Sequence, residues 1–170
     1  MGGAVNVPGN YSPVASFNVY SDPEAAKIIY ESGIEIVQVG LDVCNKLHFT
    51  KEDIEQLKQT HSAVASALYS MLQFRIKQIG TEGIESVARE NSIALNDVAA
   101  AAYLINPEWF VTVNASGTIA CDELCRGQTV LETKVNPNKK QNIVFAKDVN
   151  AEAVVSAWLH AISNYAEEEK

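Results

Sequence analysis

The chain has 170 residues, of which 47% are hydrophobic, so it is long and apolar enough for one compact domain with a buried core. Its formal net charge is −8, which argues against a surface for nucleic acid or anionic membranes, because such surfaces need clustered basic residues. No stretch approaches the roughly 18 consecutive apolar residues of a membrane-spanning helix.

Three cysteines bear on the cellular compartment and on metal binding: Cys44, Cys121 and Cys125. An odd count, with no apolar leader after Met1, predicts a reduced, cytoplasmic protein. Neither "CDELC" nor "CNKLH" has the spacing and the second pair of a zinc site, so these cysteines are interpreted as ordinary thiols near strand ends.

The first 20 residues show no helical periodicity and are predicted to form a loop, since they contain Gly2, Gly3, Pro8, Gly9 and Pro13. A helix is predicted in "SDPEAAKIIYES", where Asp22 suits the cap, Pro23 the first helical position and Gly33 the end. The following "IEIVQVGLDV" predicts a strand that ends at Gly40.

Two helices are predicted next. Thr50 opens "TKEDIEQLKQ", with Asp53 three residues later as a near capping box. A longer helix follows and is broken at Gly80 and Gly83. It carries one apolar stripe for core packing, made of Val64, Leu68, Leu72 and Ile76.

The last part is predicted to contain a helix, three strands and a helix. In "SIALNDVAAAAYLINPEWF", Asn96 or Asp97 caps a short helix that ends near Asn106. The strand candidates are "WFVTVN", "QTVLETK" and "NIVFAKDV". Asn150 caps a final amphipathic helix, whose apolar face contains Val154, Trp158 and Ile162. With no repeat or linker, the chain is predicted to be a single domain over residues 1–170.

Two polar clusters are candidate binding sites. Asn10, Ser16 and Asn18 lie in the N-terminal loop, and Asn96 and Asp97 lie at a helix start. Short amide, hydroxyl and carboxylate groups suit the hydroxyls of a sugar, and an aspartate also suits a hard cation such as calcium. The alternative is that these residues are simply helix caps and turn residues.

Long motifs in the chain resemble a known family. "MGGAVNVPGNYSPVASFNVYSDPEAAKIIYESGIEIVQVGLDV" resembles the middle of the inosine–uridine-preferring nucleoside hydrolases, which read MGG, a GN pair, EFN, DPEAA and a strand ending GLDVT. "LNDVAAAAYLINPEWF" is similar to the family's HDPLAVAYLIDPELF, and "CRGQTVLE" to its RGxTVVD. The resemblance covers nearly the whole chain.

This resemblance implies a fold class and an activity. The fold would be α/β, with a mostly parallel sheet flanked by helices, of which this chain is the C-terminal part. The family hydrolyses the N-glycosidic bond of ribonucleosides to base and ribose, through an oxocarbenium-like transition state. It uses a calcium ion held by several aspartates, and its members are commonly dimers or tetramers.

The family's site residues carry over to five positions. Asn10 and Asn18 match ribose ligands, and Asp97 matches a ligand of calcium and ribose. Ser16 stands where the family has a glutamate, and Asn96 where it has the histidine assigned as the acid for the departing base. Asparagine cannot deliver a proton near neutral pH, and loss of a positioned acid costs about 10²–10⁴ in rate.

The family's aspartate cluster, D-x-D-x-G-x-D-D, is absent from these 170 residues. We therefore expect an incomplete domain, from a truncated or split product or a two-chain assembly, with "IEIVQVG" as an exposed sheet edge. One hypothesis is a nucleoside hydrolase that is inactive or weak as this isolated chain. The alternative is a non-catalytic remnant or half-domain that pairs with another chain, and an acidic α/β domain of other function is a third.

Overall fold

The computed structural model describes residues 1–60, 62–81 and 92–168. They divide into two compact units. The first unit comprises Met1–Lys46 and Asn96–Val149, and the second comprises Leu47–Leu95 and Asn150–Lys170. The prediction of one partial domain over residues 1–170 stays a prediction. Among the described helices, none is long and apolar enough to cross a membrane.

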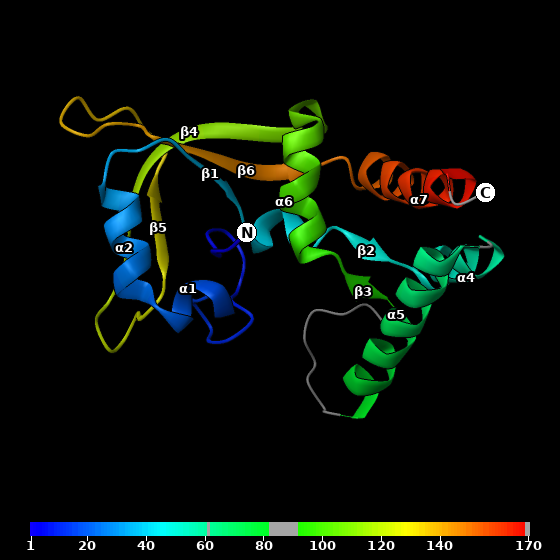
Figure 1. Cartoon of the computed structure of the whole chain (residues 1–170). Coiled ribbons are helices and arrows are strands. Elements are labelled where there is room, and N and C mark those ends of the chain that lie inside the picture. Colours follow the sequence, from blue (N-terminus) through cyan, green and yellow to red (C-terminus); the bar gives the residue numbers. More distant parts are fainter. Residues whose placement is uncertain (61, 82–91, 169–170) are drawn as a thin grey trace. The chain divides into compact units, whose positions relative to one another are not determined.

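The first unit is built on a four-stranded sheet in the order β1-β6-β4-β5 (Figure 1). The predicted strands are confirmed, as β1 (Ile36–Val39), β4 (Phe110–Ile119), β5 (Thr129–Glu132) and β6 (Ile143–Val149). As predicted, β1 lies at an edge of this sheet. The α/β class is also confirmed.

The expectation of a mostly parallel sheet is corrected for this chain, because the sheet is mixed. Strand β1 is parallel to β6, whereas β4 is antiparallel to both β6 and β5. Parallel neighbours need a crossover of about a dozen or more residues, usually a helix. No helix separates β4, β5 and β6 along the chain, so these strands pair antiparallel.

Four helices and one 3-10 helix accompany this sheet: α1 (Phe17–Ser21), α2 (Pro23–Glu31), α3 (Leu41–Cys44), α6 (Asn96–Ile105) and η1 (Pro107–Trp109). The predicted cap of α2 is confirmed, since Asp22 Oδ1 accepts a hydrogen bond from Ala25 N at 2.9 Å. Helix α1 was not predicted, because five residues are too few to show a helical period. Helix α6 starts at Asn96, so Asn96 and Asp97 lie in its first turn rather than before it.

One face of the sheet in the first unit is buried. Gln38 of β1 and Phe145 of β6 are register partners and are only 4% and 2% exposed. The Tyr30 hydroxyl of α2 donates a hydrogen bond to Gln38 Oε1 at 2.8 Å, and its burial raises the pKa of Tyr30. Helix α2 therefore covers this face.

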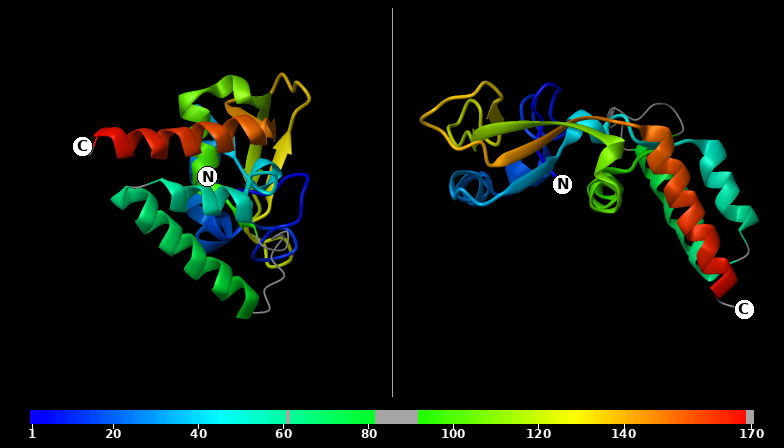
Figure 2. Two further views of the ribbon diagram at one scale, coloured as in Figure 1. Left: turned by 90° about the vertical axis from the view of Figure 1, so that its right-hand side faces the viewer. Right: turned by 90° about the horizontal axis from the view of Figure 1, so that it is seen from above.

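The second unit is helical, with α4 (Lys51–Gln59), α5 (Ala63–Thr81) and α7 (Ala151–Glu168) around a small β2–β3 ladder (His48–Phe49 and Ile93–Ala94). Helices α5 and α7 lie side by side (Figure 2). The ladder was not predicted, since strands of two residues have no periodicity. The unit's core contains Leu57, Ala65, Leu68, Tyr69, Leu72, Trp158, Leu159 and Ile162.

Both predicted caps in the second unit are confirmed. Thr50 and Asp53 form a reciprocal capping box at the start of α4, and Asn150 Oδ1 accepts from Ala153 N at 3.1 Å before α7. Helix α5 continues through Gly80 to Thr81, so Gly80 does not end it. Gly83, the second glycine predicted to interrupt this helix, lies outside the described residues.

Candidate functional site

Each of the two predicted ribose ligands, Asn10 in the N-terminal loop and Asn18 in α1, is held by one amide atom. Asn10 Oδ1 accepts from Phe17 N at 2.8 Å, and Asn18 Nδ2 donates to Met1 O at 3.0 Å. Both side chains are exposed. Each amide thus keeps its second polar atom, the Asn10 Nδ2 donor and the Asn18 Oδ1 acceptor, available to a ligand.

Ser16 is the anchor of the same loop. Its side chain is buried, at 2% exposure, and its Oγ accepts from Gly3 N at 2.8 Å. The hydroxyl therefore stabilises the conformation of this loop. A direct contact of Ser16 with a substrate stays a prediction.

Met1–Gly3 lie against the carboxyl end of β1, where the N-terminus is visible in Figure 1. Gly2 N donates to Val39 O at 3.1 Å, and Leu41 N donates to Gly3 O at 2.9 Å. Ligands of open α/β sheets bind outside the carboxyl ends of the parallel strands. Through its bond to Met1, Asn18 is held at this end of the sheet.

The predicted residues of α6 approach the same place through Cys44. The buried Cys44 thiol donates to Asn96 O, with a sulfur–oxygen distance of 3.6 Å. Burial raises the pKa of this thiol to about 12, the carboxylates of Asp97 and Asp42 add to the rise, and the Met1 ammonium opposes it. The charges of Met1 and Asp97 therefore both lie near enough to this thiol to affect its pKa.

Asn96 and Asp97 differ in what they offer a ligand. Asn96 Oδ1 is buried and has no hydrogen-bond donor among the described residues. Asp97 is exposed. The structure thus brings Asn10, Ser16, Asn18, Asn96 and Asp97 to one end of the first unit, which spacing in the sequence alone could not show.

Two cavities of the first unit lie at the other end of β1. One, of about 380 Å³, is lined in part by Gly33, Ser116 and Asn142, and the other, of about 290 Å³, by Glu35 and Asn142 among others. Gly33 and Asn142 precede the first residues of β1 and β6. Neither cavity contains any of the five predicted site residues.

Comparison with known proteins identifies the family. The family model described as inosine-uridine preferring nucleoside hydrolase matches residues 1–156. The chain belongs to this nucleoside hydrolase family.

Several relatives show how much of the family's fold this chain contains. The pyrimidine-specific ribonucleoside hydrolase RihA of Salmonella newport is 32% identical over 167 residues, covering 98% of this chain and 52% of RihA. The solved plant nucleoside hydrolase PpNRh1 superposes with a TM-score of 0.82 at 27% identity, over 95% of this chain and 52% of that one. The purine-preferring ribonucleoside hydrolase from Gardnerella vaginalis has the same fold, with a TM-score of 0.87 at 24% identity, over 98% and 51%. The chain spans about half the length of these relatives.

The calcium ion of the nucleoside hydrolases does not fit the described residues alone. No group of three or more His, Cys, Asp or Glu side chains in residues 1–60, 62–81 and 92–168 could hold a metal. Asp42, which is 3% exposed, already accepts from Val5 N and Asn6 N at 3.0 and 2.8 Å. Calcium takes about 6–8 oxygen ligands, and Asp97 supplies one carboxylate. A calcium site would therefore need ligands from outside these residues.

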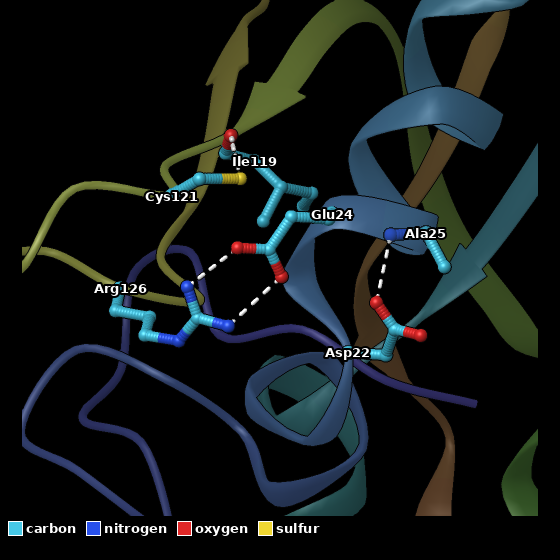
Figure 3. Close-up of polar contacts among 6 residues, drawn as sticks. All are labelled: Asp22, Glu24, Ala25, Ile119, Cys121 and Arg126. Carbon is cyan, nitrogen blue, oxygen red and sulfur yellow. Dashed lines mark hydrogen bonds and ion pairs between the residues drawn. The ribbon is translucent and has the colours of Figure 1, made fainter.

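Sequence reasoning missed an ion pair that links the β4–β5 connection to α2. Arg126, between β4 and β5, binds Glu24 in the first turn of α2 (Figure 3). Cys121 Sγ donates to Ile119 O in the same connection, at 3.7 Å. Both charged residues lie in the motifs "DPEAA" and "CRGQTVLE", so their opposite charges were the available signal.

Proposed function

We propose that this chain supplies the ribose-holding part of a nucleoside N-ribohydrolase site, and that the other half of the fold supplies the groups that activate water. The substrate is a ribonucleoside. Water adds across the bond between ribose C1′ and the base nitrogen, giving free ribose and free base. One observation supports the proposal most: the predicted residues lie near one another at the carboxyl end of β1. Asn18 bonds to Met1 there, and Cys44 bonds to Asn96. The charges of Asp97 and Met1 both affect the pKa of Cys44.

The available atoms suit the hydroxyls of ribose. Asn10 Nδ2 donates, while Asn18 Oδ1 and the Asp97 carboxylate accept, so the three side chains together can orient a diol. Orientation of the sugar is a large part of catalysis, since it fixes the reacting carbon relative to the attacking water. Asn96 cannot protonate the departing base, so the chain itself provides no general acid at that position.

The test compares the chain alone with the chain plus the separately expressed N-terminal half of Salmonella newport RihA. Release of hypoxanthine from inosine and of uracil from uridine is followed by chromatography with calcium present. We expect no release above the uncatalysed rate from the chain alone, and release from the mixture. Turnover by the chain alone in the usual enzyme range, about 1–10³ per second, would show that no second half is needed.

A matched pair of variants tests the ribose contact itself. Asn18→Ala removes the proposed acceptor, and Asn138→Ala alters an exposed asparagine between β5 and β6. In the mixture, Asn18→Ala should weaken ribonucleoside binding, measured by calorimetry, while Asn138→Ala should leave it unchanged. Equal binding by both variants contradicts the role of Asn18.

The second candidate is a non-catalytic half-domain that pairs with another chain. It is favoured by Asn96, which stands at the family's acid position, and by Ser16, whose hydroxyl is engaged with Gly3. A mixture that binds ribonucleosides but releases no base supports this candidate. A mixture that releases base excludes it.

A further inference from the structure

The larger cavity of the first unit lies at the amino end of β1, away from the candidate site. Its lining residues come from α2, β4, β5 and the β5–β6 connection. In Figure 1, α2, β5 and this connection lie on the same side of the unit. The volume of about 380 Å³ is within the range of about 300–1,000 Å³ that is usual for pockets that bind small molecules.

Hydrogen bonds between distant segments hold one wall of this cavity in place. Lys140 Nζ donates to Gly33 O at 2.8 Å, and Asn142 Nδ2 donates to Ile34 O at 2.7 Å. Both bonds join the β5–β6 connection to the turn between α2 and β1, where Gly33 has a φ of +79°. The wall is therefore formed before any ligand arrives, as is usual for ligand pockets.

The cavity has one positive charge without a carboxylate partner. Its charged lining residues are Glu31, Glu132, Lys139 and Lys140. Lys139 Nζ lies 3.0 Å from Glu132 Oε2, and Lys27 Nζ lies 3.8 Å from Glu31 Oε1. Both carboxylates thus have a lysine partner, whereas Lys140 bonds only to the Gly33 carbonyl among the described residues. This charge balance favours an anionic ligand.

Polar groups of the lining have hydrogen-bonding capacity to spare. The Lys140 ammonium has three N–H donors, and the Gly33 carbonyl occupies one of them. Ser116 is 5% exposed, and its Oγ has no hydrogen-bond partner among the described residues, although buried hydroxyls are normally bonded. Asn142 uses Nδ2, so its Oδ1 can accept. The lining thus combines donors for an anion with acceptors for hydroxyl groups.

We propose that this cavity binds a small phosphorylated sugar. The Lys140 ammonium and the Ser116 hydroxyl donate to the phosphate oxygens. The sugar hydroxyls donate to Asn142 Oδ1 and to the carboxylates of Glu31 and Glu132. Lysine is a common ligand of phosphate, whereas bidentate recognition of a carboxylate normally uses arginine, and no arginine lines the cavity. The inference does not depend on the proposed function, because none of these residues belongs to the candidate site.

The smaller cavity is a poorer place for an anion. It shares Lys140 and Asn142 with the larger one, but Glu35 also lines it. Among the described residues, Glu35 forms no ion pair that would neutralise its charge. A phosphate there would be repelled by this carboxylate, so the larger cavity is the proposed site.

An NMR titration of the full 170-residue chain tests the site. The probes are D-ribose 5-phosphate and D-glucose 6-phosphate, each compared with its unphosphorylated sugar and with inorganic phosphate. We expect at least one sugar phosphate to bind with a dissociation constant of about 1 mM or lower. Its binding should shift the amide signals of Gly117, Thr118 and Asn142, and leave those of Asn18 and Asp97 unchanged. The free sugars should not bind.

A matched pair of lysine variants tests the phosphate contact. Lys140→Gln removes the proposed cation, and Lys134→Gln removes the same charge from an exposed lysine of the same connection that does not line the cavity. We expect Lys140→Gln to weaken binding at least about tenfold and Lys134→Gln to leave it nearly unchanged. Ser116→Ala should weaken it about two- to tenfold. Urea midpoints near that of the parent show that the variants are folded.

Four results would overturn the proposal. The first is that neither sugar phosphate binds. The second is an equal loss in Lys140→Gln and Lys134→Gln, which would mean that overall charge attracts the ligand. The third is inorganic phosphate binding as tightly as the sugar phosphates, which would mean that the sugar is not recognised. The fourth is amide shifts at Asn18 and Asp97 in place of those at the cavity, which would locate the ligand at the candidate site.

Discussion

Arg126 and Glu24 form a bidentate ion pair between residues 102 positions apart in the chain. Nη1 lies 2.6 Å from Oε1 and Nη2 lies 2.8 Å from Oε2 (Figure 3). The planar guanidinium matches both carboxylate oxygens, which a lysine ammonium cannot do. The pair therefore links the β4–β5 connection to the first turn of α2, which directly follows α1 and Asn18.

The ion pair predicts a specific acid dependence of stability. The hydrogen bonds to Arg126 hold the pKa of Glu24 below its ordinary value of 4.5. The contribution of the pair is therefore fully present above about pH 4.5 and is lost as the pH falls through the lowered value. Urea midpoints measured from pH 7 to 3 should fall less steeply in Glu24→Gln than in the parent chain. The change will be small, since both groups are exposed to solvent.

Arg126→Lys separates geometry from charge in the same pair. Lysine retains the attraction but makes only one of the two hydrogen bonds. We expect the urea midpoint of Arg126→Lys to fall between pH 7 and 3 by an amount intermediate between the parent chain and Glu24→Gln. A fall identical to that of the parent would mean that the charge alone, without the two parallel hydrogen bonds, stabilises the connection.

Gly3, next to the candidate site, has no room for a Cβ atom. It has a φ of +91°, and an added Cβ would lie 2.5 Å from Gln38 Nε2 and 3.0 Å from Thr129 Oγ1. Gln38 is held by Tyr30, so it cannot move without losing that bond. Gly3→Ala should cost about 1–2 kcal/mol for the positive φ and about 1–3 kcal/mol more for the overlap.

Gly33→Ala is the matched control for Gly3→Ala. Gly33 also has a positive φ, +79°, but an added Cβ there meets nothing within 4 Å. Gly33→Ala should lower the free energy of unfolding, measured in urea, by only about 1–2 kcal/mol. If the two variants are equally stable, the overlap with Gln38 has no energetic cost.

The capping box of Thr50 and Asp53 stabilises the start of α4 in the second unit. Its Oγ1 accepts from Asp53 N at 3.2 Å, while Asp53 Oδ2 accepts from Thr50 N at 2.9 Å. Thr50→Ala should destabilise the chain by about 1 kcal/mol, because one N–H at the start of α4 loses its acceptor. Thr50→Ser keeps the oxygen and should unfold near the parent midpoint. Equal losses would mean that the methyl group, not the cap, is responsible.

Local signals in the sequence predicted most elements, while long-range pairing was not readable from it. Asp22, Thr50 and Asn150 marked helix starts correctly, because a cap acts within three residues of its own position. The pairing of β1 with β6, which are more than 100 residues apart, depends on contacts between distant segments. Ser16 shows the same limit at the site. Its motif position suggested a ribose ligand, but only the fold reveals that its hydroxyl is engaged with Gly3.

The structure changes how catalysis should be restored at the candidate site. Ser16→Glu would force a larger, charged side chain into a position that is 2% exposed, and it would remove the acceptor for Gly3 N. Asn96→His is the cleaner variant, because Asn96 Oδ1 has no donor to lose among the described residues. With the RihA half present, Asn96→His should raise the rate of base release by about 10²–10⁴.

The pH profile identifies the cause of any gain from Asn96→His. A histidine that donates a proton to the departing base gives a rate that falls as the pH rises through the imidazole pKa, near 6.5 unless the site shifts it. A gain that is independent of pH would come from packing rather than from acid catalysis. His160→Asn, a change at an exposed residue of α7, controls for a general effect of exchanging histidine and asparagine and should leave the rate unchanged.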